Sequence, residues 1–312
     1  KTWIMKRIVK RTYRLKKYFS DDIWSIDLDG LSKAKARLVR YIKVFMLTIK
    51  TFSGEKIGFQ AVALSFFSTM SVVPFVAVIF AVTGGLGLAD KLVELLYTYF
   101  NNSQETINTV LGFAQNIINT AESSTMGLVS ALLFVWLVIW LMLSVERVFN
   151  NVWKVRKSRN LFKRLSITIS MLIISPFVVL VFFSGSVVYS HALEYMGLNV
   201  EEFTIFKTIL SWVLFAAVAA FTFSAMYKFI PNAPVKYWNA LKAAVPAAVA
   251  FTVVQYMYLE TQVFVTRLNA VYGAFAAVPL FMLWLNIGWF IILIGAELSY
   301  AFQHVDNYNI ED

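Results

Sequence analysis

The sequence predicts an all-α integral membrane protein with six transmembrane helices and with the N- and C-termini in the cytoplasm. Six stretches contain no Lys, Arg, Asp or Glu: 57–89, 123–145, 165–193, 208–227, 243–259 and 268–296. A helix needs about 20 apolar residues to cross the hydrocarbon core of a bilayer, where a single segment can satisfy its backbone only as a helix. The composition agrees, because 59% of the 312 residues are hydrophobic and 15% are charged.

The distribution of basic residues predicts the orientation of these helices. Of the 28 Lys and Arg residues, 15 precede the first stretch, seven lie between the second and third, and three lie between the fourth and fifth. The other three connections contain one each: Lys91, Lys207 and Arg267. Because Lys and Arg are retained on the cytoplasmic side, the basic connections are expected inside. The net charge of +10 then favours anionic lipids of the inner leaflet as the partner, rather than nucleic acid.

The N-terminal region, residues 1–53, is basic and amphipathic. Residues 1–20 set apolar side chains among eight basic residues. Residues 31–53 repeat this pattern at helical spacing, with the apolar positions Leu38, Tyr41, Ile42, Phe45, Ile49 and Phe52. Such patterns are typical of helices that lie in the membrane interface, and the second is expected to lead into the first span. A soluble cytoplasmic helical hairpin is the alternative.

The membrane domain is expected to cover residues 54–303, followed by a cytoplasmic tail, 304–312. Its spans are predicted at about 57–83, 126–145, 166–190, 208–227, 243–259 and 271–296. The short fifth stretch is flanked by Lys242 and Glu260, which can extend to the headgroups. The outer connection 88–122 has two amphipathic patterns separated by Asn101-Asn102-Ser103, which predicts an outer helical hairpin.

Prolines interrupt four of the predicted spans. They are Pro74, Pro176, Pro246 and Pro279. Proline removes an intrahelical hydrogen bond and kinks a helix, although it is more frequent in transmembrane helices than in soluble ones. Ordinary kinks and kinks that open a cavity or allow rocking are both consistent with the pattern.

One face of the first predicted span is polar, with Gln60, Ser65, Ser68 and Thr69. Small polar residues at this spacing usually allow close helix packing and interhelical hydrogen bonds, and a substrate-lining role is the alternative. No charged residue lies near the middle of any predicted span, where ion-coupled transporters often place one. Uncharged centres suit a path for amphipathic molecules, whose tails need no polar lining.

A second polar group is expected at the cytoplasmic ends of the even-numbered spans, and we call it the inner collar. It contains Glu146, Arg147 and Asn150 after span two, Lys228 after span four and Glu297 after span six. Because these spans all run from outside to inside, the five residues lie at one depth. Glu146 or Glu297 can pair there with Arg147 or Lys228 in an inner gate or a headgroup site. Independent, solvated interface residues are the alternative, and exposed pairs contribute little.

Enzymatic readings have little support in this sequence. The chain has no Cys, and its two His residues, His191 and His304, form no HExxH-type pair. It also has no GxSxG elbow and no phosphate-binding P-loop. We therefore expect no enzyme activity, no cofactor and no metal site.

Several segments, taken in order, resemble one family. They are Gln60–Phe67 with Val73-Pro74-Phe75, Val145–Trp153 with the basic tail to Arg164, Phe229–Val235 with Pro231 and Asn232, Tyr272-Gly273-Ala274, and Gly295-Ala296-Glu297. Over about residues 50–303 the chain is similar to the YihY/BrkB family of bacterial inner-membrane proteins, formerly labelled ribonuclease BN-like. The resemblance implies a six-span bundle in the cell inner membrane.

The resemblance also suggests functions, which differ among members. Some members have carried a ribonuclease label, some a virulence or serum-resistance label, and some are suspected of moving envelope lipids or lipopolysaccharide precursors. A ribonuclease finds no support in these residues, because the chain offers no soluble domain and no metal cluster.

The leading hypothesis is a transport or lipid-handling protein without an ATPase module. Its substrate would be an amphipathic, anionic envelope lipid or precursor that moves or docks between helices. A non-transporting scaffold for envelope assembly and a small-solute pore are the alternatives. A homo-oligomer or an envelope-assembly partner is compatible with each of these hypotheses.

Overall fold

A computed structural model describes residues 31–54, 56–85, 87–99, 125–155, 159–160, 204–266 and 270–308, with Trp24 and scattered positions in 108–119 and 162–173. The helices are α2 (Lys33–Gly54), α3 (Ile57–Gly85), α4 (Ala89–Tyr99), α6 (Thr125–Val152), α8 (Thr204–Phe229), α9 (Tyr237–Thr266) and α10 (Ala270–His304), followed by a 3₁₀ turn, Val305–Asn307. In this part of the chain there is no strand, which confirms the all-α prediction.

Four of the helices contain apolar segments long enough to cross a membrane. The segments are Val135–Val152 in α6, Trp212–Phe229 in α8, Tyr237–Thr261 in α9 and Val278–His304 in α10. They correspond to the predicted second, fourth, fifth and sixth spans. The predicted first span lies within α3, which contains the shorter apolar segment Ile57–Val72.

Other predictions fall mainly outside the described residues. The proposed interfacial segment 1–20 lies outside them, and the predicted third span, 166–190, is described at only a few helical positions near its start. In the predicted outer hairpin, α4 forms a helix over Ala89–Tyr99, and Tyr97 donates a hydrogen bond to Asn108. The hairpin as a whole stays a prediction.

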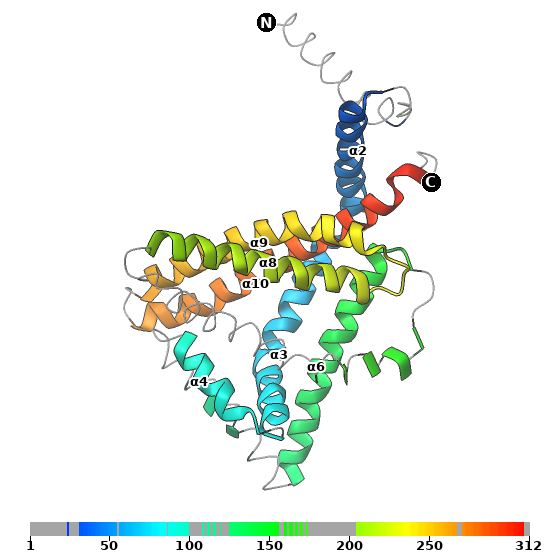
Figure 1. The fold of residues 1–312 in the computed structure, drawn as a ribbon. Coiled ribbons are helices and arrows are strands. Elements are labelled where there is room, and N and C mark those ends of the chain that lie inside the picture. The colour runs from blue at the N-terminus through cyan, green and yellow to red at the C-terminus, as the bar shows by residue number, and fades with distance from the viewer. Residues whose placement is uncertain are drawn as a thin grey trace, which may run out of the picture.

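The ends of several helices gather at one place, which we call the helix junction. Helices α2, α6 and α8 end there, α3 and α9 begin there, and α10 passes through it (Figure 1). Helix α9 packs between α8 and α10, and α3 packs against both α10 and α6. From the junction the α3–α6 pair and the α8–α9–α10 layer extend in different directions (Figure 1). Segments far apart in the sequence are therefore held together at one end of the fold.

The largest hydrophobic core lies at this junction. Its buried members come from five helices and include Ile57, Val145, Tyr227, Ala244 and Leu293. Five alanines of α9 are buried in the same core: Ala240, Ala243, Ala244, Ala247 and Ala248. Small residues let helix backbones approach closely, which is the usual way that membrane helices associate. Large apolar side chains elsewhere on the spans, such as Phe59, Leu132 and Phe221, are exposed, as expected for lipid-facing positions.

Helix α2 packs on the last turns of α10, beyond the junction. Val44 and Leu47 of α2 form a small buried cluster with Ala301 and Val305. Helix α10 has 35 residues, so it is roughly 52 Å long at about 1.5 Å per residue. That exceeds the hydrocarbon thickness of about 30 Å, so the last turns of α10 can reach past the bilayer and support α2.

Candidate functional site at the helix junction

The α8–α9 loop, residues 230–236, is the part of the junction to which the surrounding side chains converge. Pro231 and Pro234 cannot continue α8, because proline lacks the N–H group that a helix interior requires. The last carbonyl groups of a helix have no partner within it and must be satisfied by other groups. At this loop, side chains from other elements supply those partners.

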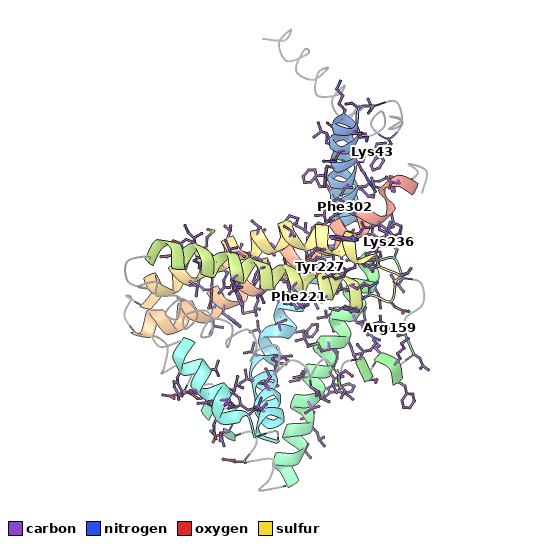
Figure 2. All side chains as sticks on the ribbon, viewed as in Figure 1. Lys43, Arg159, Phe221, Tyr227, Lys236 and Phe302 are labelled. Carbon is purple, nitrogen blue, oxygen red and sulfur yellow. The ribbon has the colours of Figure 1, made fainter. Side chains whose placement is uncertain are left out.

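Arg159 binds three successive carbonyl oxygens where α8 ends. Its Nη1 donates to the oxygen of Ile230 at 3.0 Å, and its Nη2 donates to those of Phe229 at 3.2 Å and Pro231 at 3.0 Å (Figure 2). A cation at this position also meets the negative end of the helix dipole. The planar guanidinium, with five N–H donors, can serve three acceptors at once, which the single ammonium of lysine does less well.

Glu146 supplies the negative charge beside this arginine. Its Oε2 accepts a hydrogen bond from Nε of Arg164 at 2.8 Å, and its Oε1 lies 4.0 Å from Nη1 of Arg159. Nη2 of Arg164 also donates to the carbonyl oxygen of Leu143 at 2.8 Å. The side chains of Glu146, Arg159 and Arg164 are 9%, 13% and 14% exposed, so this is a buried charge network. In such a network the loss of one partner leaves an uncompensated charge.

Asn150 holds the same loop one helical turn after Glu146. Its Oδ1 accepts a hydrogen bond from the backbone N–H of Asn232 at 2.7 Å. Because residues four apart lie on one face of a helix, α6 presents Glu146 and Asn150 together to the loop. We refer to Glu146, Asn150, Arg159 and Arg164 as the junction latch.

Two further side chains hold the loop from α8 and α10. Lys228 donates to the carbonyl oxygen of Val235. Gln303 of α10 accepts from the backbone N–H of Lys236 at 2.9 Å and donates to the carbonyl oxygen of Pro234 at 3.1 Å. The loop is therefore bound by α6, by the segment after α6, by α8 and by α10.

Close packing of α8 and α9 on α10 depends on Gly295. A Cβ atom at this position would collide with the hydroxyl group of Tyr227 and would lie 2.9 Å from the Cβ of Ala247. Two residues later, Glu297 is fully buried. The family-like motif Gly295-Ala296-Glu297 thus lies at a helix contact that leaves no room for a Cβ atom at its first position.

The predicted polar face of α3 lies against α10. Ser68 accepts a hydrogen bond from Nε1 of Trp289 at 2.9 Å, and Ser65 accepts a longer one from Nδ2 of Asn286 at 3.5 Å. Thr69 donates to the carbonyl oxygen of Ser65 in its own helix, and Gln60 is half-buried on α3. This geometry is that of a hydrogen-bonded helix interface.

The structure brings some inner-collar residues together and separates others. Glu146 and Asn150 are buried in the latch, and Lys228 binds the same loop, whereas Arg147 is exposed. The partners predicted for Glu146 were wrong: it pairs with Arg164 and Arg159 rather than with Arg147 or Lys228. The side chain of Arg147 points away because consecutive residues of a helix lie on different faces.

The other residues of the family-like motifs lie in different parts of the fold. Pro231 and Asn232 lie in the bound loop, Pro74 is buried within α3, and Tyr272 and Gly273 lie in the first turn of α10. Sequence reasoning missed Arg159, Arg164 and Gln303 as site residues. One signal was available, since a carboxylate buried at a helix end needs a cation, and arginine is favoured over lysine in buried pairs.

Comparison with known proteins relates the chain to a set of membrane proteins. The family model described as Virulence factor BrkB matches residues 48–312. A UPF0761 membrane protein of Haemophilus influenzae (strain 86-028NP) is 26% identical over 263 residues, which are 83% of this chain and 95% of that protein. One from Psychrobacter sp. (strain PRwf-1) is 30% identical over 244 residues, 78% of this chain and 45% of that protein.

A third relative, from Aromatoleum aromaticum (strain DSM 19018 / LMG 30748 / EbN1), is 28% identical over 248 residues, 76% of this chain and 58% of that protein. The chain therefore spans about half the length of the Psychrobacter and Aromatoleum relatives. No solved structure matches it significantly.

Proposed function

Because this chain belongs to the Virulence factor BrkB family of membrane proteins, we propose that it moves or docks an amphipathic, anionic envelope lipid or lipid precursor between its helices. In this proposal the protein lies in the cell inner membrane, crosses it six times and has both termini in the cytoplasm. It works without an ATPase module and is not an enzyme.

The observation that carries the proposal is the position of charge along the spans. Charged residues of α6, α8, α9 and α10 lie near helix ends, and α3 has none. At mid-depth the α3–α10 interface offers hydroxyl, amide and indole groups, Ser65, Ser68, Asn286 and Trp289. A lipid needs no charged relay in the membrane centre, whereas ion-coupled carriers usually have one. A lipid does need recognition at the headgroup level, and in this proposal the charges of the junction lie at that level.

The junction latch supports a gating role at the cytoplasmic end. Arg159 is held by Glu146 and by backbone oxygens of α8 and its following loop. Arg164 is held by Glu146 and by the carbonyl oxygen of Leu143 in α6. In this proposal these contacts keep the junction closed. Phosphate groups bind guanidinium in the same bidentate way as carboxylates do. A lipid phosphate could therefore compete with Glu146 for these arginines as the latch opens.

A reconstituted lipid-translocation assay tests this function. Protein is placed in liposomes that contain tail-labelled fluorescent phosphatidylglycerol or phosphatidylcholine, and dithionite bleaches the label in the outer leaflet. We expect bleaching beyond the outer-leaflet fraction, greater for the anionic lipid. Arg159→Lys retains the charge but serves fewer carbonyl oxygens, so we expect it to speed translocation, whereas Arg147→Ala should match the parent protein.

Two results would overturn the proposal. One is bleaching that stops at the outer-leaflet fraction with folded protein for both lipids, which would favour the scaffold alternative. The other is conductance of small ions in planar bilayers without lipid movement, which would favour the solute pore.

A further inference from the structure

Helix α2 leaves most of its most hydrophobic stripe exposed, although the ring of Tyr41 also contacts Phe302 of α10 edge-on. The stripe consists of Leu38, Tyr41, Phe45 and Ile49, which are 62%, 51%, 63% and 52% exposed. Their spacing of three and four residues puts them on one helix face. The helix uses a different face, with Val44, Leu47, Thr48 and Thr51, to pack toward the rest of the protein. Its more polar face is therefore the buried one, which is unusual for a helix that borders only water.

The helix is also fixed in position, so the stripe cannot turn inward. Arg40 forms a 2.7 Å ion pair with Asp306, and Lys50 hydrogen-bonds with Tyr308. The buried Lys43 side chain donates to the carbonyl oxygen of Trp24 at 3.4 Å, and helical spacing of about 100° per residue puts it on the face away from the stripe. These contacts tie α2 to the end of α10 and its following turn.

The charge of α2 identifies the kind of surface that can cover the stripe. The helix contains six basic residues and no acidic residue. At about 100° per residue, helical spacing puts Lys35 and Arg37 on either side of the stripe, and both are exposed. An apolar stripe with basic borders is the pattern of a helix that lies in an anionic membrane interface. A second copy packed on the same stripe would bring basic borders together and meet repulsion.

Connectivity places α2 at the membrane. Only residues 55 and 56 separate it from α3, and Lys56 has a left-handed backbone conformation, with φ of 51°, that turns the chain between the two helices. The first predicted span begins with α3, so α2 is expected to start from the bilayer surface. We propose that α2 is a lipid-binding helix whose stripe enters the acyl-chain region while Lys35 and Arg37 bind anionic headgroups.

This proposal rests on the membrane assignment and does not require that the protein moves lipid. The chain has no Cys, so single Cys substitutions provide clean labelling sites. An environment-sensitive fluorophore is attached at Phe45→Cys, at Ile49→Cys or at the control Lys33→Cys, which lies away from the stripe. Each labelled protein is placed in nanodiscs of phosphatidylcholine that contain brominated phosphatidylglycerol or brominated phosphatidylcholine at the same mole fraction.

We expect bromine to quench both stripe labels several times more strongly than the Lys33→Cys label. We also expect the anionic brominated lipid to quench more than the zwitterionic one. Each basic residue near the surface favours anionic lipid by about fivefold, so Lys35→Gln with Arg37→Gln should remove a preference of roughly 25-fold in local lipid ratio. Unchanged thermal unfolding shows that these variants are folded.

Two outcomes would overturn the proposal. The first is equal quenching at Phe45→Cys and Lys33→Cys, which would mean that the stripe does not contact acyl chains. The second is rapid disulfide formation between two Phe45→Cys chains together with weak quenching, which would identify a second copy as the occupant. Lipid translocation is measured separately, so failure of either proposal leaves the other testable.

Discussion

Nε of Arg164 lies 2.8 Å from Oε2 of Glu146, so the segment that follows α6 is bonded back onto α6 itself. Both side chains are largely buried, and Arg159 adds a second cation 4.0 Å from the same carboxylate. Through Arg159 the network continues to the end of α8. One glutamate therefore couples two helices that meet at the junction.

Replacing this glutamate should destabilise the protein. Glu146→Ala leaves two buried guanidinium groups without a counter-charge, and removing one partner of a buried pair typically costs about 3 to 5 kcal/mol. We expect a loss near the lower end, because water can still reach the arginines. Thermal unfolding in detergent measures it, with the exposed neighbour Arg147→Ala as the matched control. Equal unfolding temperatures for the two variants would show that the pair does not stabilise the junction.

Gly295 offers a second test, because a methyl group there has no room. Gly295→Ala places a Cβ against the hydroxyl group of Tyr227 and near Ala247, and overpacking of this kind costs about 1 to 3 kcal/mol. The control is Gly58→Ala, where the nearest atom, on Phe290, lies at 3.6 Å. That variant should be neutral or slightly stabilising, since alanine is the better helix former by about 0.5 to 1 kcal/mol.

The collision between the new methyl group at residue 295 and Tyr227 can also be reduced by changing Tyr227. Tyr227→Phe removes the hydroxyl oxygen that meets the new methyl group, so it should recover part of the stability lost in Gly295→Ala. Recovery would be incomplete, because Ala247 still lies close. If Tyr227→Phe lowers the unfolding temperature equally in both backgrounds, the predicted collision between the two residues is absent.

The α3–α10 interface provides a third prediction, through the hydrogen bond from Trp289 to Ser68. Trp289→Phe, Ser68→Ala and the double variant form a mutant cycle. Hydrogen bonds between membrane helices contribute about 0.6 kcal/mol on average, because competing partners exist when the bond is absent. We expect a coupling of about this size from unfolding in detergent mixtures. Exactly additive single effects would mean that the contact is packing without a hydrogen bond.

Much of the fold was predictable because the bilayer sets the length of a span. The charge-free stretches 208–227 and 243–259 fall within α8 and α9, and the apolar core of α6 was found in the same way. The end of α10 was not predicted. Glu297 marked the end of the last predicted span, yet the helix continues to His304 with that carboxylate buried inside the protein. A hydropathy pattern shows that a charged residue is present, but it does not show whether that residue faces the protein interior or the solvent.

Sequence reasoning pointed to several of the helix ends that meet at the site, but not to the contacts between their side chains. Even-numbered spans that run in one direction are expected to place Glu146, Lys228 and Glu297 at a similar level, and the structure gathers the ends of α6 and α8 at the junction, through which α10 passes (Figure 1). The partners of Glu146 come from the segment after α6: Arg159 lies outside any helix, and Arg164 lies at a helical position whose direction the periodicity of α6 does not fix. Likewise, the apolar stripe of α2 was evident, whereas its second face, Val44 and Leu47, is too short a pattern to recognise alone.

The last prediction is the membrane topology. Because the sequence contains no Cys, each single Cys substitution gives one labelling site. Ser103→Cys and Asn199→Cys should react with a membrane-impermeant maleimide from outside the cell, and Ser158→Cys only after permeabilisation, because the basic segment around it is retained in the cytoplasm. Asn199→Cys is the informative position, since it reaches the outside only if 166–190 crosses the membrane. If Asn199→Cys is protected to the same degree as Ser158→Cys, the prediction that 166–190 crosses the membrane is wrong. If all three sites label in the reverse pattern, the predicted orientation of the protein is wrong.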